Sequence, residues 1–467
     1  MKGLLWLMLL LVPTSVLYSQ ETQVVKLRLE NYPDTALILA SYYGNRIEVM
    51  DTAYKTKMQN FNFKRSGGFP KGVYMVANFK RQKLFEFVIS QKTSFLLETK
   101  GPDFTGNMQV SKTPENQMFF QFINKNNQLY KTLKNLKKEL KKPTLSTEKK
   151  AQIKKKIIAV NTYIRNFKAL NEQKYPDFFV TKILKASDEI KIPEGHSHDT
   201  LYRFRYVKAH YWDNFNLGNN GLFRTPLYAM KVSRYFKYYV PMIPDSVIQS
   251  IGLVMRKAKP CQECFSFLAW KFISDYQNPK YMGFDKVFVN LVDKYFMKDS
   301  VLNATTSIKK LLKERADKLR PTLIGNAAPD LILIDSSGQY IDFKALKTKF
   351  TLLVFWDYHC GICKKELAEL KEMIPYLHKK YDLSVYAISI NPDISNWKKA
   401  LKERNYPWIN VNGTHSIKGD FTKTYDIPGT PQLYLLNKKK VIIAKKFSIN
   451  QLKAILNHYL KEKINNN

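Results

Sequence analysis

Four cysteines form two C-x-x-C pairs, and these pairs are the residues of the chain best suited to covalent chemistry. The pairs are Cys261/Cys264 and Cys360/Cys363. Two thiols at this spacing can close a disulfide, exchange it with another disulfide, or supply half of a zinc site. The interval between the pairs is far longer than the roughly 15–20 residues of a compact zinc ribbon. No His follows either pair, so attachment of a c-type haem is not indicated.

The pair Cys360/Cys363 stands where a strand gives way to a helix. A continuous apolar run, Phe350–Phe355, reads as a strand buried on both faces, and the helix should run from Gly361 to about Lys380. A thiol at that point faces the unpaired N–H groups and positive end of the helix, which lowers its pKa. Cys363 lies one turn further on the same face. We therefore expect Cys360 to be the nucleophile and Cys363 the resolving thiol.

The elements that must position this pair alternate between strand and helix from about Leu323 onward. A hairpin opens the region, a central strand follows, and the remaining strands and helices give the order βαβ followed by ββα. The expected strands are 331–334, 340–343, 350–355, 384–390, 408–411, 432–436 and 441–445, and the expected helices are 361–380, 395–403 and one from 450. This order predicts a C-terminal α/β domain over residues 322–467.

Two motifs resemble the signatures of the thioredoxin superfamily. Phe355-Trp356 precedes the cysteines, and Gly429-Thr430-Pro431 precedes an apolar strand about seventy residues later. The resemblance implies a thioredoxin fold, in which Pro431 is a cis-proline facing the cysteines and Trp356, Thr430 and Pro431 bind substrate. An ordinary loop proline at the start of a strand is the alternative, although X–Pro bonds are the only ones that adopt cis cheaply.

A narrower resemblance is to the redoxin/TlpA-like envelope thioredoxins, related to AhpC/TSA proteins and used in cytochrome c maturation. The segments Asn326–Asp330 and Asp335–Gly338 are similar to the opening hairpin of that group. Cys363-Lys364-Lys365-Glu366 also resembles it, which implies that Glu366 tunes proton transfer. Ordinary thioredoxins carry a buried Asp where Val354 stands, so Glu366 is the nearby candidate acid; a solvent-facing helix charge is the alternative.

Two departures from the group leave the redox direction open. His359 precedes the nucleophile where many relatives have Trp, and as a cation it could stabilise the thiolate or have no special role. The dipeptide between the cysteines is Gly-Ile, which matches neither the reducing Gly-Pro pattern nor the oxidising Pro-His pattern.

The second pair, Cys261/Cys264, follows Pro260 and precedes an apolar helix. A structural or inert pair is the first interpretation, and it competes with a relay that exchanges electrons with Cys360/Cys363 and with metal binding. We assign no metal site to the chain.

The two regions in front of the C-terminal α/β domain differ in their sequence patterns. Short apolar runs separated by turn residues predict an antiparallel β-sandwich over residues 22–110, and helical periodicity predicts an all-α domain over residues 111–320. They loosely resemble accessory domains of envelope proteins with no established activity, so the resemblance implies no catalytic residues there. The residues that carry this loose resemblance are Glu115-Asn116, Arg224-Thr225-Pro226 and Met282-Gly283.

The first residues predict export. Lys2, the apolar run Leu4–Val12 and the small residue Ser19 give residues 1–19 the pattern of a signal peptide, too short to span a bilayer. An uncleaved membrane anchor is the alternative. The net charge of +37 comes mostly from dispersed lysines. No nucleic-acid motif accompanies them, so we expect solvated surface charge and no nucleic-acid partner.

These observations predict a periplasmic or cell-envelope thiol:disulfide oxidoreductase, acting as a reductase of protein disulfides and recharged by a membrane-embedded electron donor. Its cofactor would be the dithiol itself, without a small molecule. Two alternatives remain. A thiol peroxidase would need a Thr three residues before the reactive cysteine, where Asp357 stands. A binding or assembly factor would use the front domains to hold a partner, with the redox site secondary.

Overall fold

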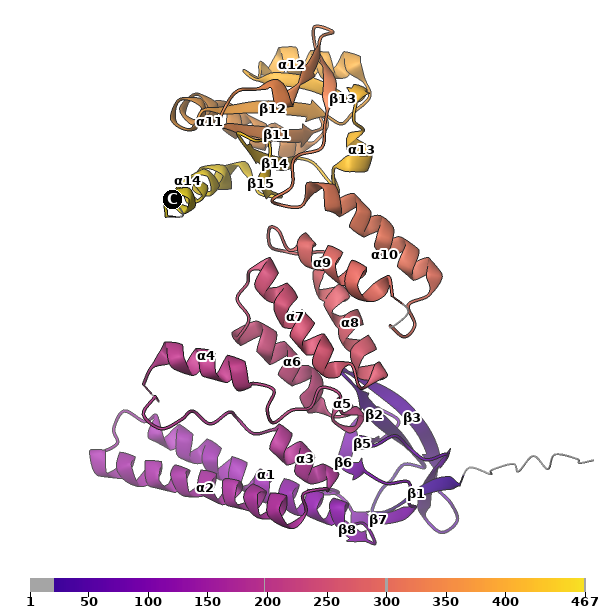
Figure 1. Ribbon diagram of the computed structural model, residues 1–467. Coiled ribbons are helices and arrows are strands. Elements are labelled where there is room, and N and C mark those ends of the chain that lie inside the picture. Colours follow the sequence, from indigo (N-terminus) through magenta and orange to yellow (C-terminus); the bar gives the residue numbers. More distant parts are fainter. Residues whose placement is uncertain (1–20, 197, 299–300, 466–467) are drawn as a thin grey trace, which may run out of the picture. The chain divides into compact units, whose positions relative to one another are not determined.

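The computed structural model describes residues 21–196, 198–298 and 301–465 of the chain (Figure 1). The predicted signal peptide, residues 1–19, lies outside the described residues. The chain divides into two compact units, one ending at Tyr239 and the other beginning at Val240. This division falls inside the region 111–320, which the sequence predicts as one helical domain.

The first unit begins with eight strands in two four-stranded sheets, ordered β4-β1-β7-β8 and β3-β2-β5-β6. The strands are β1 (Thr22–Glu30), β2 (Ala36–Tyr43), β3 (Arg46–Tyr54), β4 (Asn60–Ser66), β5 (Gly72–Ala77), β6 (Lys83–Ile89), β7 (Phe95–Lys100) and β8 (Gln109–Ser111). The predicted β-rich N-terminus is confirmed. The prediction that all strands are antiparallel is wrong for one pair, because β1 and β7 are parallel. The long stretch of chain between them supplies the crossover that a parallel pair needs.

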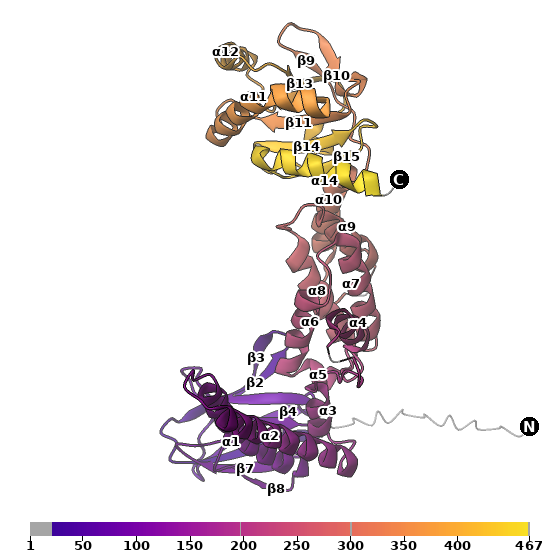
Figure 2. The same cartoon turned by 90° about the vertical axis from the view of Figure 1, so that its left-hand side faces the viewer.

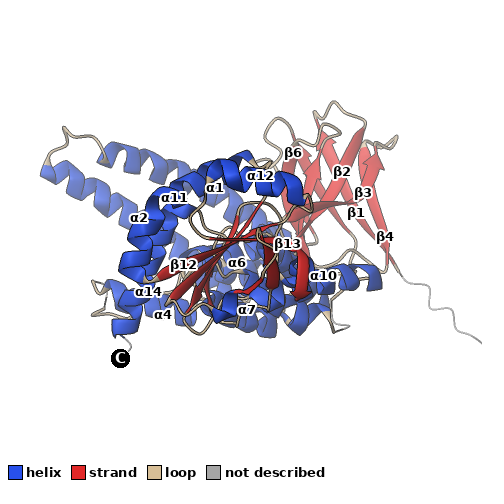
Figure 3. Ribbon diagram, turned by 90° about the horizontal axis from the view of Figure 1, so that it is seen from above, coloured by secondary structure: helices blue, strands red, loops and turns tan. Residues whose placement is uncertain are grey.

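Helices follow the strands in the same unit. They are α1 (Pro114–Leu140), α2 (Thr147–Lys174), α3 (Phe179–Ala186), α4 (Thr200–His210), α5 (Asn220–Phe223) and α6 (Pro226–Tyr238). Ser146 caps α2 by accepting a hydrogen bond from the N–H of Lys149. Helices α1 and α2 run side by side as a helical hairpin, in agreement with the helical periodicity of this region (Figure 3).

The front motifs that the sequence singles out in this unit bind backbone. The side chain of Asn116 accepts from the N–H of Val88 at 2.8 Å and donates to its carbonyl oxygen at 2.9 Å. Glu115 accepts from the first N–H of α3 at 3.0 Å. The carbonyl oxygen of Arg224 accepts from the N–H of Val73 at 2.9 Å. The Asn116 and Arg224 contacts join the helical segments to strands β6 and β5, and the Glu115 contact joins α1 to α3, so these motifs have a structural explanation.

The second unit opens with helices and continues into the redox domain (Figure 2). Its first elements are α7 (Pro244–Ala258), α8 (Gln262–Tyr276), α9 (Asp285–Leu291), the π-helical turn η1 (Val292–Phe296), α10 (Thr306–Leu319) and the 3-10 turn η2 (Arg320–Thr322). Beyond η2, Gly325 donates to the carbonyl oxygen of Ile442 at 2.9 Å, and Ile442 donates to that of Asn326 at 2.9 Å. The chain thus passes from the helices directly onto the edge of the C-terminal sheet.

The redox domain is built on a seven-stranded sheet of order β10-β9-β13-β12-β11-β14-β15. The strands are β9 (Ile332–Asp335), β10 (Tyr340–Asp342), β11 (Phe350–Trp356), β12 (Leu383–Ser389), β13 (Ile409–Lys418), β14 (Gln432–Asn437) and β15 (Ile442–Lys445). The 3-10 turns η3 (Phe343–Ala345) and η4 (Ile449–Gln451) and the helices α11 (Gly361–Tyr381), α12 (Ile394–Arg404), α13 (Phe421–Thr424) and α14 (Leu452–Asn465) complete it. Strands β11, β12 and β13 are parallel, and the other pairs are antiparallel. The predicted C-terminal thioredoxin fold is confirmed.

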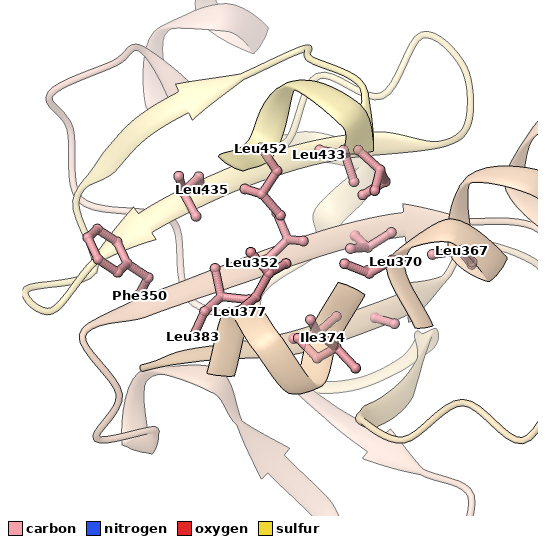
Figure 4. Packing of buried hydrophobic residues seen from close by; sticks show 14 of the residues in the cluster. Phe350, Leu352, Leu367, Leu370, Ile374, Leu377, Leu383, Leu433, Leu435 and Leu452 are labelled. Atoms are coloured by element: carbon pink, nitrogen blue, oxygen red, sulfur yellow. The ribbon is translucent and has the colours of Figure 1, made fainter. Parts of the chain in front are cut away.

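Strand β11 carries the core on both of its faces, since every one of its residues is buried. On one face Leu352 packs with Leu377 of α11 and Leu452 of α14 (Figure 4). On the other face Phe355 packs with Tyr425 and Tyr434. Full burial of this strand explains why all its residues but Thr351 are apolar, and it gives the cysteines at its end a fixed base. Among the described residues, no helix has both the length and the apolar character needed to cross a lipid bilayer.

Candidate functional site

Cys360 is the N-cap residue of α11, as its place in the sequence predicts. Its sulfur accepts a hydrogen bond from the N–H of Cys363 at 3.1 Å. On the opposite side its thiol donates to the carbonyl oxygen of Thr430 at 3.3 Å. The side chain is half-buried, so the sulfur is held between the helix and the Thr430 loop while keeping access to solvent.

The two free thiols of this site differ in burial and in pKa. Cys363 is completely buried, and burial, together with the hydrogen bond to Cys360, raises its pKa to about 12. For Cys360, burial raises the pKa, but hydrogen bonds from Cys363, the Thr430 side chain and backbone N–H groups outweigh it. The pKa of Cys360 is therefore lowered. The expected division into a nucleophile and a protonated resolving thiol agrees with this asymmetry.

The short loop between β11 and α11 is held by contacts that sequence reasoning missed. Asp357 accepts from the N–H of His359 at 2.8 Å and, through its carbonyl oxygen, from the N–H of Cys360 at 3.1 Å. Tyr358 donates to the Asn391 side chain at 3.1 Å, and Arg404 donates to the Tyr358 carbonyl oxygen at 2.8 Å. Asn391 and Arg404 belong to later segments of the chain, so no local pattern points to them.

The Thr430–Pro431 peptide bond is cis, as the resemblance implies for Pro431. Both residues are half-buried, and the Thr430 carbonyl oxygen contacts the Cys360 thiol. The fold thus brings Cys360 and Cys363 close to Thr430 and Pro431, which follow about seventy residues later in the sequence.

Direct substrate binding by Trp356 is not supported, because its side chain has 0% exposure. The indole ring meets Tyr406 edge to face, with ring centroids 5.8 Å apart, and Arg404 lies over it at 5.7 Å. An aromatic residue at the end of a central strand turns into the core here, because β11 is covered on both faces. Trp356 belongs to the same buried cluster as Cys363, so it supports the site from within the core.

Glu366 lies in the second turn of α11 and is half-buried. Its carboxylate accepts a hydrogen bond from the N–H of Ile449 at 3.1 Å, at the start of the C-terminal helical segment. This contact gives the carboxylate a structural partner, and its role in proton transfer stays a prediction. The His359 side chain is exposed, and so is that of Ile362 between the cysteines.

The second pair, Cys261/Cys264, is joined as a disulfide at the start of α8. Cys264 is completely buried and Cys261 nearly so. A disulfide supplies no free thiolate to a metal ion, so the metal-binding alternative is not supported. Helices α8 and α11 lie apart in both Figure 1 and Figure 2.

Comparison with known proteins gives two family matches, one to the C-terminal domain and one to the helical region in front of it. Residues 324–445 match the AhpC/TSA family, and residues 144–319 match DUF5106, a domain of unknown function. The thiol-disulfide oxidoreductase ResA of Bacillus thuringiensis subsp. konkukian is 28% identical over 141 residues, covering 30% of this chain and 78% of the relative. The ResA of Bacillus subtilis is 24% identical over 122 residues, covering 26% and 64%.

Solved structures with similarity include a domain of a possible thiol-disulfide isomerase from Cytophaga hutchinsonii. It is 35% identical, with 31% of this chain and 97% of that chain covered and a TM-score of 0.29. A thioredoxin-like protein from Bacteroides caccae is 22% identical, with 58% and 97% covered and a TM-score of 0.44. The family match and the ResA relatives agree with the paired thiols at the end of β11. The C-terminal part of this chain belongs to the redoxins of the thioredoxin superfamily, and the protein is an oxidoreductase of the thiol–disulfide class.

Proposed function

We propose that the protein reduces disulfides of other proteins in the cell envelope. The observation that carries this proposal is the half-buried Cys360 sulfur, capped by its helix and set against Thr430, above the fully buried Cys363. An extended substrate segment could reach the first sulfur and not the second. The proposed division of labour follows from this difference in access.

The reaction would proceed in two exchanges. The Cys360 thiolate attacks one sulfur of the substrate disulfide, forms a mixed disulfide and expels the other substrate sulfur as a thiolate. Cys363 then loses its proton and attacks the Cys360 sulfur, which closes the Cys360–Cys363 disulfide and releases the second substrate sulfur. Two electrons pass to the substrate, and a membrane-embedded donor would return them. The dithiol itself would serve as the cofactor.

The reducing direction is supported by the kind of groups that stabilise the thiolate. The groups that lower the pKa of Cys360 are the Cys363 thiol, the Thr430 side chain and backbone N–H groups, all of them neutral. Neutral donors stabilise an anion less than cations do. A strong oxidant owes its potential to a strongly stabilised reduced form, so weaker stabilisation favours a reductase.

Export to the envelope is supported by the signal-like first residues and by the second cysteine pair. A buried disulfide between Cys261 and Cys264 is typical of a chain that lives in an oxidising compartment. The resemblance to TlpA-like proteins supports a role of the cytochrome c maturation kind. The substrate there would be a C-x-x-C disulfide that must be reduced before haem attachment.

We also infer that the two N-terminal sheets pack face to face as a β-sandwich. Phe87 of β6 and Phe95 of β7 belong to different sheets, and their rings meet edge to face with centroids 6.0 Å apart. Buried aromatic and aliphatic side chains from both sheets would form the shared core.

The test is the reduction potential of the Cys360/Cys363 couple in the full chain, measured by equilibration with glutathione. We expect a value near the roughly −270 mV of thioredoxin, and a value near the roughly −120 mV of a strong oxidant would contradict the proposal. A peptide with a C-x-x-C-H disulfide should be reduced by the wild type and not by Cys360→Ser. Reduction by both proteins would show that the activity does not belong to this site.

A further inference from the structure

The loop that presents Thr430 to Cys360 begins at a buried carboxylate. Asp426 follows α13, and its side chain is only 2% exposed. Its carboxylate accepts from Lys446 at 2.9 Å and from the two terminal nitrogens of the Arg315 guanidinium group, Nη1 and Nη2, at 2.6 and 3.1 Å. Its carbonyl oxygen accepts from the Tyr434 hydroxyl at 3.0 Å. The start of the loop is thus fixed through side chain and backbone together.

Arg315 reaches this carboxylate from the helical segment in front of the redox domain. It lies on α10, 111 residues earlier in the chain than Asp426. A paired, bidentate guanidinium–carboxylate contact sets both distance and orientation. Arg315 therefore links α10 to the loop that carries Thr430.

Helix α10 is in turn anchored to the sheet. Lys445 of β15 forms an ion pair with Asp285 at the start of α9, and both side chains are almost completely buried. The same ammonium group donates to the carbonyl oxygen of Thr322, just after α10, at 2.6 Å. Buried charges separate only at high cost, so α9, α10 and β15 should hold their relative positions.

Only three residues, Ile427-Pro428-Gly429, separate Asp426 from Thr430. Ile427 packs against the buried cluster that includes Phe355 and Tyr434. If Arg315 were removed, the Asp426 carboxylate would keep its contact with Lys446 but would lose the bidentate one, at a position that water hardly reaches. The loop would then have to open to solvate the carboxylate. Such a movement would draw Thr430 away from the Cys360 sulfur.

We propose that Arg315 is a positioning residue of the redox site, whose ion pair with Asp426 holds the Thr430–Pro431 loop against Cys360. The inference rests on the proposed function only in taking Cys360 as the attacking thiol. It extends the redox machinery to a helix in front of the predicted domain 322–467.

The test is the pH profile of Cys360 alkylation by iodoacetamide in the reduced full chain, for the wild type, Arg315→Gln and Asp426→Asn. Because the rate follows the thiolate fraction, we expect Arg315→Gln to slow alkylation at pH 7 by about three-fold or more. The midpoint of its profile should rise, since the Thr430 side chain helps to lower the pKa of Cys360. Arg315→Lys, which keeps the charge and loses the bidentate geometry, should give a smaller shift in the same direction.

Asp426→Asn separates positioning from plain electrostatics. Removing a negative charge at a distance would lower the midpoint, whereas release of the loop would raise it. A raised midpoint in Asp426→Asn supports the proposal, and a lowered or unchanged midpoint overturns it. This variant decides alone if Arg315→Gln does not fold, as judged by circular dichroism.

Arg320→Gln is the matched control. Arg320 follows α10 and makes a bidentate contact with Asp293 at 2.7 and 2.9 Å, but both side chains are partly exposed. Its profile should coincide with that of the wild type, and a shift equal to that of Arg315→Gln would contradict the proposal. Mass spectrometry of the labelled protein identifies the alkylated residue. Label on a residue other than Cys360 would refute the proposed function, whereas label on Cys360 with an unchanged Arg315→Gln profile refutes the positioning role alone.

Discussion

The two C-x-x-C pairs share their spacing and their local backbone geometry. In each pair the first cysteine is the N-cap of a helix, and its sulfur accepts from the N–H of the second, at 3.2 Å for Cys261 and 3.1 Å for Cys360. Yet Cys261 and Cys264 are buried and joined, whereas Cys360 is half-buried and faces Thr430. A helix N-terminus therefore accounts for what the pairs share. The difference between the pairs comes from the solvent access of Cys360 and from the Thr430 loop that faces it.

The largest expected difference between the pairs is in catalysis. Cys360→Ser should reduce the rate of disulfide reduction by about a thousand-fold or more, because a hydroxyl does not replace a thiolate as the nucleophile. The double variant Cys261→Ala/Cys264→Ala should retain activity within about two-fold, since that pair is buried away from substrate. Turnover with the physiological partner is the measurement. A large loss in the double variant would break the comparison and support an electron relay.

A second difference is expected in titration of the reduced Cys360/Cys363 pair. The lowered pKa of Cys360 and the pKa of about 12 for Cys363 mean that one thiolate per chain forms first. Alkylation of Cys360 should level off below the usual thiol pKa of about 8.5, and Cys363 should react only in strong alkali. Ultraviolet thiolate absorbance and mass spectrometry measure both steps. Equal reactivity of the two thiols would contradict the asymmetry.

The same pKa values give a sign for stability. The raised pKa of Cys363 stabilises the folded reduced protein below the unfolded pKa of about 8.5, and this contribution is lost as the pH rises toward about 12. The lowered pKa of Cys360 acts in the opposite sense, and its contribution is lost as the pH falls through the folded value.

A third, smaller effect concerns the stability that the second pair supplies. The loop closed by Cys261 and Cys264 is short, so the chain-entropy contribution of the disulfide is about 2 kcal/mol. We expect Cys261→Ala/Cys264→Ala to lower the free energy of unfolding by about that amount, measured by urea unfolding under oxidising conditions. Unchanged stability together with slower turnover would reverse the roles assigned to the two pairs.

The smallest expected effect is that of Glu366→Gln. The amide keeps a hydrogen bond to the Ile449 N–H but loses the charge, which should cost less than about 1 kcal/mol of stability. Turnover should change by less than about three-fold, because the carboxylate already has a structural partner. A loss of more than about ten-fold in the release step, without loss of stability, would restore the predicted role in proton transfer.

Local pattern predicts the parts of the site that depend on local structure. The apolar run 350–355 forms the expected central strand, and the cysteine before Gly361 caps the following helix. Strand β13 extends to Lys418, beyond the predicted 408–411, because its polar second half pairs irregularly with β9. Such an irregular pairing leaves little alternation for a sequence pattern to reveal.

Contacts between distant segments could not be predicted. The ion pair between Arg315 and Asp426 joins residues far apart in the chain, and no local pattern connects them. The burial of Trp356 depends on Tyr406 and Arg404 from later segments. The sequence leaves the state of Cys261 and Cys264 open, because the same spacing suits a disulfide, a relay or a metal site. Tertiary packing decides each of these points.

The buried ion pair between Lys445 and Asp285 bears on how redox domains of this kind could be exchanged between proteins. A chimera joined at residue 322 would place Lys445 of one parent against whatever replaces Asp285 in the other. If a neutral or basic residue replaced Asp285, the buried ammonium group of Lys445 would have no carboxylate partner. Inheritance of this redox domain in working form would therefore require joint inheritance of α9 and α10, and the unit of recombination would begin near Val240.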